Sequence, residues 1–206
     1  MEELKQEWIK ICDKYSRDIP FINYAFNQII EKYTEEHRQY HNLNHIIHFF
    51  KHSQNIKNKL NDYDSFFFAI IFHDVIYSTS NSTNEIDSAN YTEKILIPMV
   101  FPHIDQVKKL ILLTEKHTIH ELENFDSQAF LDLDLSILGS PWQNYSEYAE
   151  GIQKEWKNVP TFMYKIGRKK VLQKFLDQEN IYRSAYFQDL YEEQAKINLK
   201  KELNSL

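Results

Sequence analysis

The sequence predicts an all-α protein whose helices are joined by short loops. Glycine occurs 3 times and proline 5 times in 206 residues, well below their average usage of roughly 7% and 5%. Sheets and tight hairpins need more of these turn residues. Apolar residues recur at three- and four-residue spacings along most of the chain, as amphipathic helices require. Aromatic residues make up 15% of the chain, which is enough to fill a large core.

Prolines, glycines and capping residues indicate where these helices begin and end. Pro20 suits a first helical turn, and residues 61–64 include several side chains that can cap a helix. Residues 78–83 form a polar loop. Gly139 fits the position that follows a helix C-terminus. The expected helices cover about residues 4–15, 20–33, 43–50, 62–77, 84–97, 104–117 and 125–138, and then most of residues 141–203 with breaks at Pro160 and Gly167.

Charge and composition argue against several classes of function. The net charge of −6 argues against a nucleic-acid groove but allows a small phosphorylated ligand. Cys12 is the single cysteine, so an intrachain disulfide and a cysteine zinc site are excluded. Residues 1–7 lack the apolar segment of a secretory signal, and no apolar run approaches the ~18 residues of a membrane span. We expect a cytoplasmic protein with neither nucleic acid nor membrane as a partner, in an oligomeric state that the sequence leaves open.

The most informative stretch is residues 66–74, in which seven apolar residues run directly into His73 and Asp74. A helix this apolar belongs in a core, so it would carry both polar residues into the interior. A buried carboxylate has to be paired, hydrogen-bonded or bound to a metal ion. We therefore expect Asp74 to have a partner elsewhere in the chain.

A second acid, Asp134, lies in an apolar setting further along the chain. Its neighbours three and four residues away are all apolar, which predicts a buried position, whereas Asp132 can face solvent. Two interior acids beside an interior histidine repel unless protons or a cation intervene. A divalent metal accepts imidazole nitrogen and carboxylate oxygen. The alternative is that Asp134 pairs with an arginine or a helix N-terminus.

Four histidines at positions 41, 45, 48 and 52 offer a further ligand. On one continuous helix they lie opposite the apolar face, which predicts a solvated role for His48 and His52. His45 is the better ligand candidate, since it lies two residues into the helix if Asn44 is the cap. His41 is the second candidate.

The order of these residues is similar to that of a known family. The similarity covers residues 38–45, 72–77, 84–85, 88–89, 131–135, 137–139 and 167–168, with Thr114, His117, Glu193, Ala195, Asn198 and Leu199. A histidine, then an adjacent histidine and aspartate, then a distant aspartate resembles the HD superfamily of metal-dependent phosphohydrolases. The chain most resembles a branch of predicted HD-superfamily phosphohydrolases.

This resemblance implies one all-α HD domain over residues 1–206, with the helices before about residue 37 and after about residue 140 packed on its core. It also implies one divalent ion of manganese, iron, cobalt, nickel or magnesium. The implied ligands are His45, His73, Asp74 and Asp134, and His41 competes with His45 for the first position.

Glu85 and Arg38 complete the implied active site, together with the metal ligand Asp74. Glu85 occupies the place of an acid that handles the attacking water, and Arg38 the place from which related enzymes reach substrate phosphate. Each has a plainer alternative. Glu85 favours its own helix N-terminus through the helix dipole, and Arg38 pairs with a nearby acid such as Glu35.

Two further residues are assigned more loosely to substrate binding. His117 is either a partner of a helix C-terminus or a group that lines the pocket or binds a second metal. Arg168 lies in the basic cluster 165–170, which is either a solvated face or a site that attracts phosphate.

The predicted function is hydrolysis of a small phosphate ester, such as a nucleotide, by water that a divalent metal activates. One alternative is a module that binds a phosphorylated ligand with little turnover. The other is a two-iron oxygenase, which would draw its extra ligands from His103, His117 and His120.

Overall fold

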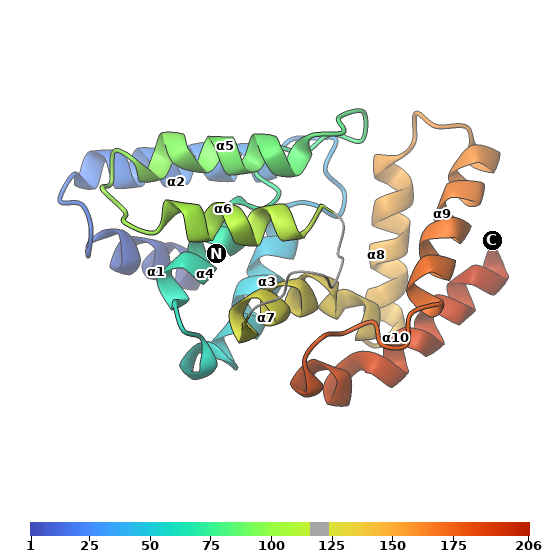
Figure 1. Ribbon diagram of the computed structural model, residues 1–206. Coiled ribbons are helices and arrows are strands. Elements are labelled where there is room, and N and C mark those ends of the chain that lie inside the picture. Colours follow the sequence, from blue (N-terminus) through green and yellow to red (C-terminus); the bar gives the residue numbers. More distant parts are fainter. Residues whose placement is uncertain (116–123) are drawn as a thin grey trace. The chain divides into compact units, whose positions relative to one another are not determined.

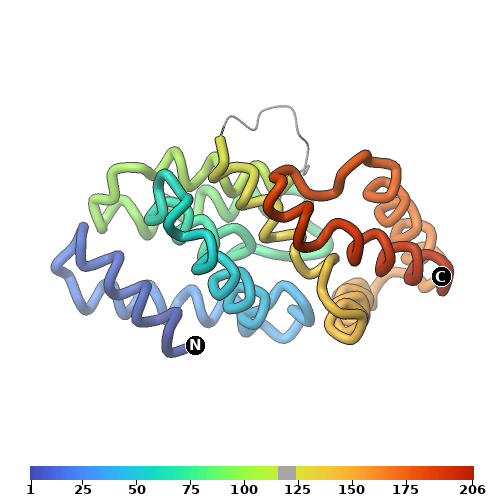
Figure 2. The backbone as a smooth tube through the Cα atoms, turned by 90° about the horizontal axis from the view of Figure 1, so that it is seen from below, coloured from blue at the N-terminus to red at the C-terminus, as the bar shows by residue number. Residues whose placement is uncertain are grey.

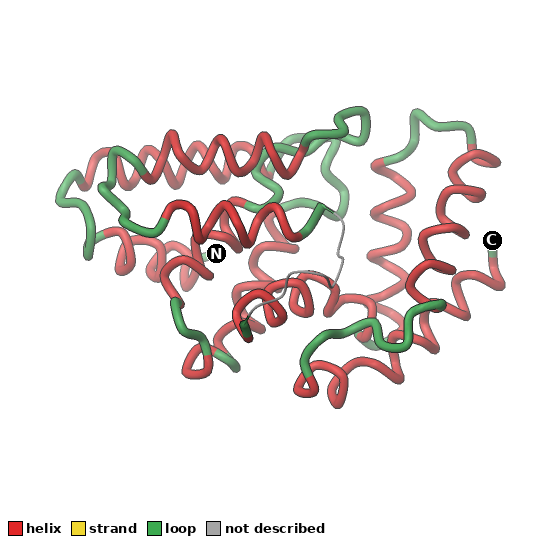
Figure 3. The backbone as a smooth tube through the Cα atoms, viewed as in Figure 1, coloured by secondary structure: helices red, strands yellow, loops and turns green. Residues whose placement is uncertain are grey.

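The computed structural model describes residues 1–115 and 124–206, and these are helical with no strand (Figure 3). The prediction of an all-α fold is confirmed. By its internal contacts the chain divides into two compact units, Met1–Glu121 and Leu122–Leu206. That the whole chain acts as one domain stays a prediction. No helix in the described ranges has both the length and the apolarity needed to cross a membrane.

The first unit contains six α-helices and a short 3-10 helix in its described part (Figure 1). Helix α4 is its centre: every residue from Ser65 to Phe72 is buried, and α4 contacts α3, α5 and α6. Trp8 packs edge-on against Phe68, with ring centroids 5.7 Å apart. The elements are α1 (Glu2–Cys12), α2 (Ile19–Tyr33), α3 (Leu43–Gln54), η1 (Lys57–Lys59), α4 (Tyr63–Phe72), α5 (Asn84–Leu96) and α6 (Ile104–Leu113).

Side-chain caps fix the starts of the helices that carry the candidate site. Asn42 caps α3 by accepting the backbone N–H of Asn44 at 2.8 Å, so the expectation that Asn44 is the cap is wrong by two residues. Asp62 caps α4 by accepting the N–H of Ser65 at 3.0 Å. Such caps satisfy N–H groups that have no partner within the helix.

Helix α4 is shorter than the sequence predicts. It ends at Phe72 instead of near Tyr77, and His73 is its C-cap residue. The N–H of His73 still bonds to the carbonyl of Ala69 at 2.9 Å, and the chain then turns. His73 and Asp74 therefore lie where the buried helix ends. The strong apolar run of the helix carries His73 into the interior, where its exposed fraction is 1%.

The second unit contains α7 (Phe125–Asp134), η2 (Leu135–Gly139), α8 (Trp142–Glu155), α9 (Thr161–Leu176) and α10 (Ala185–Ser205). Figure 2 follows these elements along the chain from another direction. Helix α10 packs against both η2 and α9. The side-chain amide of Asn198 on α10 donates to the carbonyls of Leu138 and Ser140 at 2.8 and 2.7 Å. This buried amide therefore anchors α10 to the turn between η2 and α8.

Gly139 is required by this packing and not by backbone conformation. Gly139 is the last residue of η2 and does not follow it, and no glycine of the described chain has a positive φ. A Cβ at position 139 would instead lie 2.9 Å from Cα of Tyr191 on α10. Only glycine leaves room for the two backbones at this separation.

Candidate metal centre

Three side-chain atoms of the first unit converge where α4 ends. Nε2 of His45 lies 3.1 Å from Nε2 of His73. Oδ2 of Asp74 lies 3.1 Å from Nε2 of His73 and 3.7 Å from Nε2 of His45. In the described ranges this is the one set of histidine, cysteine and acidic side chains placed closely enough to hold a metal ion. The structure therefore brings together three of the four predicted ligands.

The hydrogen bonding of His73 orients its ring for this role. Its Nδ1 lies 3.0 Å from the carbonyl oxygen of Ile70. A carbonyl only accepts, so we assign a proton to Nδ1, which leaves the lone pair of Nε2 pointing at His45 and Asp74. Metal-binding histidines commonly have this arrangement, in which the second ring nitrogen donates to a carbonyl or carboxylate.

The cluster contains more acceptors than donors. A carboxylate oxygen and an imidazole lone pair that face each other at 3.1 Å repel unless positive charge lies between them. Burial acts to raise the pKa of Asp74, but the neighbouring His73, His41 and His45 outweigh it and hold that pKa below its usual range. The carboxylate is therefore charged at neutral pH. A proton on an imidazole or a bound cation can balance it.

The spacing of the three atoms suits a divalent transition metal. A point equidistant from atoms separated by 3.1, 3.1 and 3.7 Å lies about 1.9 Å from each. Metal–nitrogen and metal–oxygen bonds are roughly 2.0–2.2 Å long, so an ion fits just outside the plane of the three atoms. The Asp74 side chain is 16% exposed and those of His73 and His45 are 1% and 4% exposed. The cluster is therefore nearly closed on the histidine side and open to solvent beside Asp74.

Arg38 lies directly behind this cluster, and its side chain is fully buried. It donates to the carbonyls of Asp74 at 2.6 Å, Val75 at 3.0 Å and His41 at 3.1 Å. Its Nε donates to the carboxylate of Glu35 at 3.1 Å. The pairing with Glu35 agrees with the plainer alternative. Four of the five guanidinium N–H donors are therefore engaged, two of them with the turn after α4. The expected contact with phosphate stays a prediction that this geometry does not favour.

Two tyrosines complete the support of Arg38 and α4. The guanidinium carbon of Arg38 lies 5.2 Å from the ring centre of Tyr33 and 5.6 Å from that of Tyr77. The Tyr33 hydroxyl donates to the carbonyl of Ile71 at 3.0 Å. The sequence does not predict a supporting role for either tyrosine. Tyr33 has the spacing of a core aromatic residue, and Tyr77 enters only as part of the residues 72–77 that carry the family resemblance.

His41 is close to the cluster without belonging to it. Its ring stacks on that of Tyr77, with centroids 4.2 Å apart, and its ring centre lies 6.1 Å from that of His45. The structure therefore groups His45, and not its competitor His41, with the other two candidate ligands. His41 lies beside the group, next to the carboxylate whose pKa it lowers.

Glu85 lies in the first turn of α5. Hydrogen bonds of the Ser88 and Asn84 side chains hold the segment between the His-Asp turn and this helix. The Ser88 hydroxyl accepts the N–H of Ile76 at 3.1 Å and donates to the carbonyl of the same residue at 3.2 Å. Asn84 accepts the N–H of Ser78 at 3.1 Å and donates to its carbonyl at 3.0 Å. Glu85 is half-buried at a helix N-terminus that favours its charge. Its catalytic role stays a prediction.

Asp132 and Asp134, two acids of α7, do not have their expected environments. Asp132 is fully buried and accepts the N–H of Arg183 at 2.7 Å and the N–H and hydroxyl of Ser184 at 2.8 and 2.9 Å. Burial raises its pKa although these hydrogen bonds act against it. The expectation that Asp132 faces solvent is therefore wrong. Asp134, which the sequence predicts to be buried, is only half-buried. Asp134 belongs to the second unit, and its role as a fourth ligand stays a prediction.

Arg168 is part of a buried ion pair in the second unit. Its Nε and Nη2 donate to the two carboxylate oxygens of Glu202 at 2.7 and 2.9 Å, and its Nη1 donates to the Tyr148 hydroxyl at 3.2 Å. Arg168 is 7% exposed. The expected solvated face is therefore wrong for this residue, and its guanidinium is already engaged. Its predicted contact with phosphate stays untested.

The remaining histidines fall into two groups. His48 and His52 are half-buried and their rings lie against each other, with centroids 4.2 Å apart, so they are less solvated than the sequence predicts. His103 pairs with Asp62, with Nδ1 2.7 Å from Oδ2. His117 and His120 lie outside the described residues.

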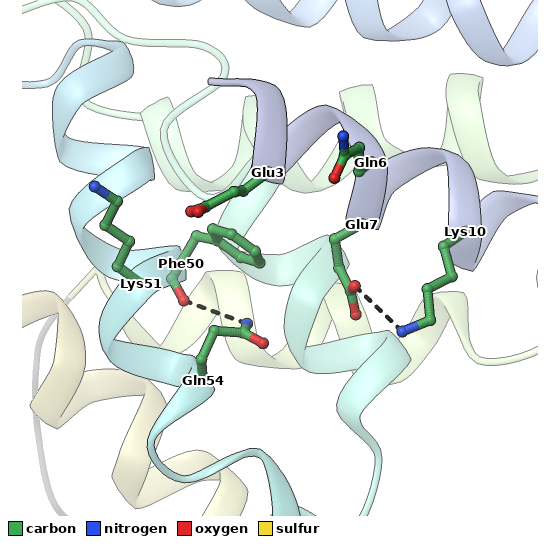
Figure 4. Close-up of a pocket in the computed structure, with 7 residues that line it drawn as sticks. All are labelled: Glu3, Gln6, Glu7, Lys10, Phe50, Lys51 and Gln54. Atoms are coloured by element: carbon green, nitrogen blue, oxygen red, sulfur yellow. Dashed lines mark hydrogen bonds and ion pairs between the residues drawn. The ribbon is translucent and has the colours of Figure 1, made fainter.

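A separate hollow lies between α1 and α3 (Figure 4) and is lined by Glu3, Gln6, Glu7, Lys10, Phe50, Lys51 and Gln54. Its most central acid, Glu7, is already paired with Lys57 at 2.6 Å and with Lys10 at 3.4 Å. These ion pairs and the hydrogen bonds from both lysines lower the pKa of Glu7, although burial acts to raise it. The charges of this hollow are balanced internally, so it does not compete with the His-Asp cluster as the candidate site.

Comparison with known proteins yields no match: no family model, no curated protein and no solved structure corresponds to the chain. The assignment of a function therefore depends on the chemistry of the cluster itself.

Proposed function

We propose that the protein is a metal-dependent phosphohydrolase that acts on a small phosphate ester. The observation that supports this most directly is the convergence of two imidazole nitrogens and a carboxylate oxygen at spacings of 3.1, 3.1 and 3.7 Å. Such a mixed nitrogen and oxygen set suits manganese, iron, cobalt or nickel. The resemblance of the sequence to HD phosphohydrolases supports the choice of reaction.

A bound divalent cation would supply two things at this position: a water of lowered pKa and an electrophile for a phosphoryl oxygen. The protein supplies the rest. His45 and His73 contribute neutral nitrogen from buried positions, and Asp74 contributes negative charge beside solvent. Arg38 fixes the backbone that carries Asp74. Glu85, at the N-terminus of α5, is the proposed group that takes a proton from water or returns one to the leaving oxygen.

The test separates metal binding from turnover by using two variants. Asp74→Ala is expected to lose both metal and phosphatase activity, because it removes the charged member of the cluster. Glu85→Gln is expected to keep about one metal ion per chain and to lose roughly a hundredfold or more in turnover, the usual contribution of a general acid or base. Metal content and hydrolysis of a panel of phosphomonoesters and nucleotides are measured on both.

Glu36→Gln, which changes an exposed acid of the same unit, is the matched control and should match the parent. Full activity in Glu85→Gln would refute the role of Glu85. Metal binding and thermal stabilisation by phosphorylated ligands, with no product from any substrate, would replace the hydrolase by a binding module. Failure of the parent to bind any divalent metal would remove the proposal altogether.

A further inference from the structure

Helices α8 and α9 present a surface that the proposed function does not use. Five apolar side chains on it are each more than a third exposed: Trp156 38%, Phe162 66%, Met163 52%, Ile166 54% and Val171 45%. Exposed apolar residues are common singly, but a contiguous group on one element usually marks an interaction site. We call these five residues, with Lys157, Lys165, Lys169, Lys170 and Lys174, the basic apolar surface.

The charge of this segment is opposite to that of the chain. Residues 156–176 contain six basic residues and no acidic one, whereas the whole chain has a net charge of −6. One of the six, Arg168, is neutralised by Glu202 inside the unit. The five lysines remain, and all but the half-buried Lys165 are exposed. A partner that complements the basic apolar surface therefore carries negative charge and also has an apolar region that the exposed apolar side chains can contact.

Apolar side chains lie on both sides of Lys170. A groove of about 260 Å³ between α8 and α9 is lined by Trp156, Met163 and Val171 among others. Gly167 forms part of this lining, and a Cβ placed there would meet nothing within 4 Å. Phe162 and Ile166 do not line the groove. At roughly 100° per residue, Ile166 lies on the other side of Lys170 from Gly167.

We propose that the basic apolar surface binds an anionic lipid membrane peripherally. Its apolar side chains would enter the boundary between headgroups and acyl chains, and its lysines would contact the lipid phosphates and carboxylates. A peptide that fills the groove would leave Phe162 and Ile166 in water, whereas a lipid surface can meet Phe162, Ile166 and Met163 together, because they lie within about 100° of one another around α9. This proposal departs from the sequence-based expectation of no membrane partner, which was based on the absence of a membrane-spanning segment.

The first test is co-sedimentation of the full chain with vesicles of phosphatidylcholine and phosphatidylserine at about three to one. We expect binding that is lost on vesicles of phosphatidylcholine alone and that weakens with added salt, because the attraction is screened. Phe162→Ser with Ile166→Ser should weaken binding at least tenfold, by removing two apolar groups. Lys169→Glu with Lys170→Glu should weaken it by a similar factor.

Matched controls test whether the loss of vesicle binding is specific to the basic apolar surface. Leu190→Ser with Ile197→Ser changes two α10 residues that are 52% and 51% exposed. Lys94→Glu with Lys200→Glu makes the same charge change at two exposed lysines elsewhere. Both pairs should bind vesicles as the parent does. Equal losses in the controls would overturn the proposal.

Fluorescence gives a second measurement. Trp156 should shift to shorter wavelength and be quenched by brominated lipid. Trp156→Phe should remove most of both effects, because Trp8 is fully buried and Trp142 is half-buried beneath Lys201. No sedimentation with phosphatidylserine vesicles would overturn the proposal. Binding to an acidic amphipathic peptide without binding to vesicles would also overturn it, and would reassign the surface to a protein partner.

Discussion

The two units each enclose a buried polar cluster, and the clusters differ in how their charges are balanced. In the second unit, Arg168 donates twice to Glu202, and the Tyr145 hydroxyl donates to the same carboxylate. Each charge there has a complementary partner. In the first unit, His45, His73 and Asp74 bring three potential acceptor atoms to one point. One cluster is balanced by an arginine within the protein, whereas the charge of the other depends on a proton or a bound cation.

The difference gives a physical criterion for separating a structural cluster from a binding site. Burial and ionisable residues are common to both. A cluster that is balanced internally is expected to serve stability, because any added ligand would have to displace an existing partner. A cluster with surplus acceptors is expected to bind a cation or protons. The four predictions below test this criterion, beginning with the largest effect.

Loss of one partner from the balanced cluster should cost the most stability. Arg168→Met leaves the Glu202 carboxylate buried without its cation, which typically costs about 3–5 kcal/mol. Arg168→Met combined with Glu202→Leu should regain most of that loss, since neither charge remains. Urea unfolding of the parent, the single variant and the double variant measures both. A double variant as unstable as the single one would mean that packing around the pair, not charge balance, sets the cost.

Removal of the Asp74 charge should change the free energy of unfolding mainly when a divalent metal is present. In a chelator Asp74→Asn should unfold near the parent's midpoint, because it removes repulsion as well as a partner. With manganese at about a hundred times its dissociation constant, the parent should gain about 2.7 kcal/mol and the variant nothing. Asp105→Asn, at an exposed acid on α6, is the control and should gain as the parent does. An equal gain in Asp74→Asn would exclude this carboxylate as a ligand.

Arg38→Lys should weaken the hydrogen bonds that hold the turn carrying Asp74, while residue 38 keeps its positive charge. Lysine has no planar fork with which to reach three carbonyls and Glu35 at once, so about 1–3 kcal/mol of stability should be lost. Metal affinity should fall with it, because the turn that carries Asp74 is no longer fixed. Arg17→Lys changes a side chain that is 84% exposed and should leave both quantities unchanged. Normal metal affinity in Arg38→Lys, with activity lost, would restore the predicted contact of Arg38 with substrate.

A lower pH should destabilise the first unit, because His48 binds a proton more readily in the unfolded chain than in the folded one. Burial, with the nearby His52 and His45, lowers the pKa of His48 to about 4, whereas an unfolded histidine titrates near 6.5. Between these values the unfolded chain binds the extra proton, so stability falls as the pH is lowered through that window. His48→Gln should remove about 1–3 kcal/mol of this dependence. Unfolding in chelator at several pH values is the measurement, and identical pH profiles would contradict the assignment.

The sequence predicts the fold class and most of the cluster because the relevant signals are local. Scarce glycine, helical spacing and good caps are properties of neighbouring residues. The apolar run before His73 is so continuous that its burial follows directly. His73 and Asp74 lie in the cluster for this reason. His45, 28 residues from His73, entered the predicted ligand set through the family resemblance. The fourth ligand, Asp134, is in a unit whose placement these local signals do not reach.

The errors come from interactions between distant residues. Acids and leucines alternate in residues 131–135, and α7 is buried on most sides, so spacing cannot tell Asp132 from Asp134. The partners of Asp132 lie 51 and 52 residues away. Arg168 was grouped with the exposed lysines because its acid, Glu202, is 34 residues away. The contacts of Arg38 with Asp74 and Val75 span 36 and 37 residues.

The two hydrogen bonds between the Asn84 side chain and the backbone of Ser78 affect which sequence changes the protein can tolerate. The Asn84 side-chain amide accepts one hydrogen bond from the backbone of Ser78 and donates another to it, which closes residues 78–84 into a small ring. Ser88 separately fixes Ile76, which lies between this ring and Asp74 in the sequence. Insertions and deletions within residues 79–83 should therefore leave His73 and Asp74 where they are. If the proposed function holds, this loop is a place where substrate preference can change through length and composition while the metal cluster is kept.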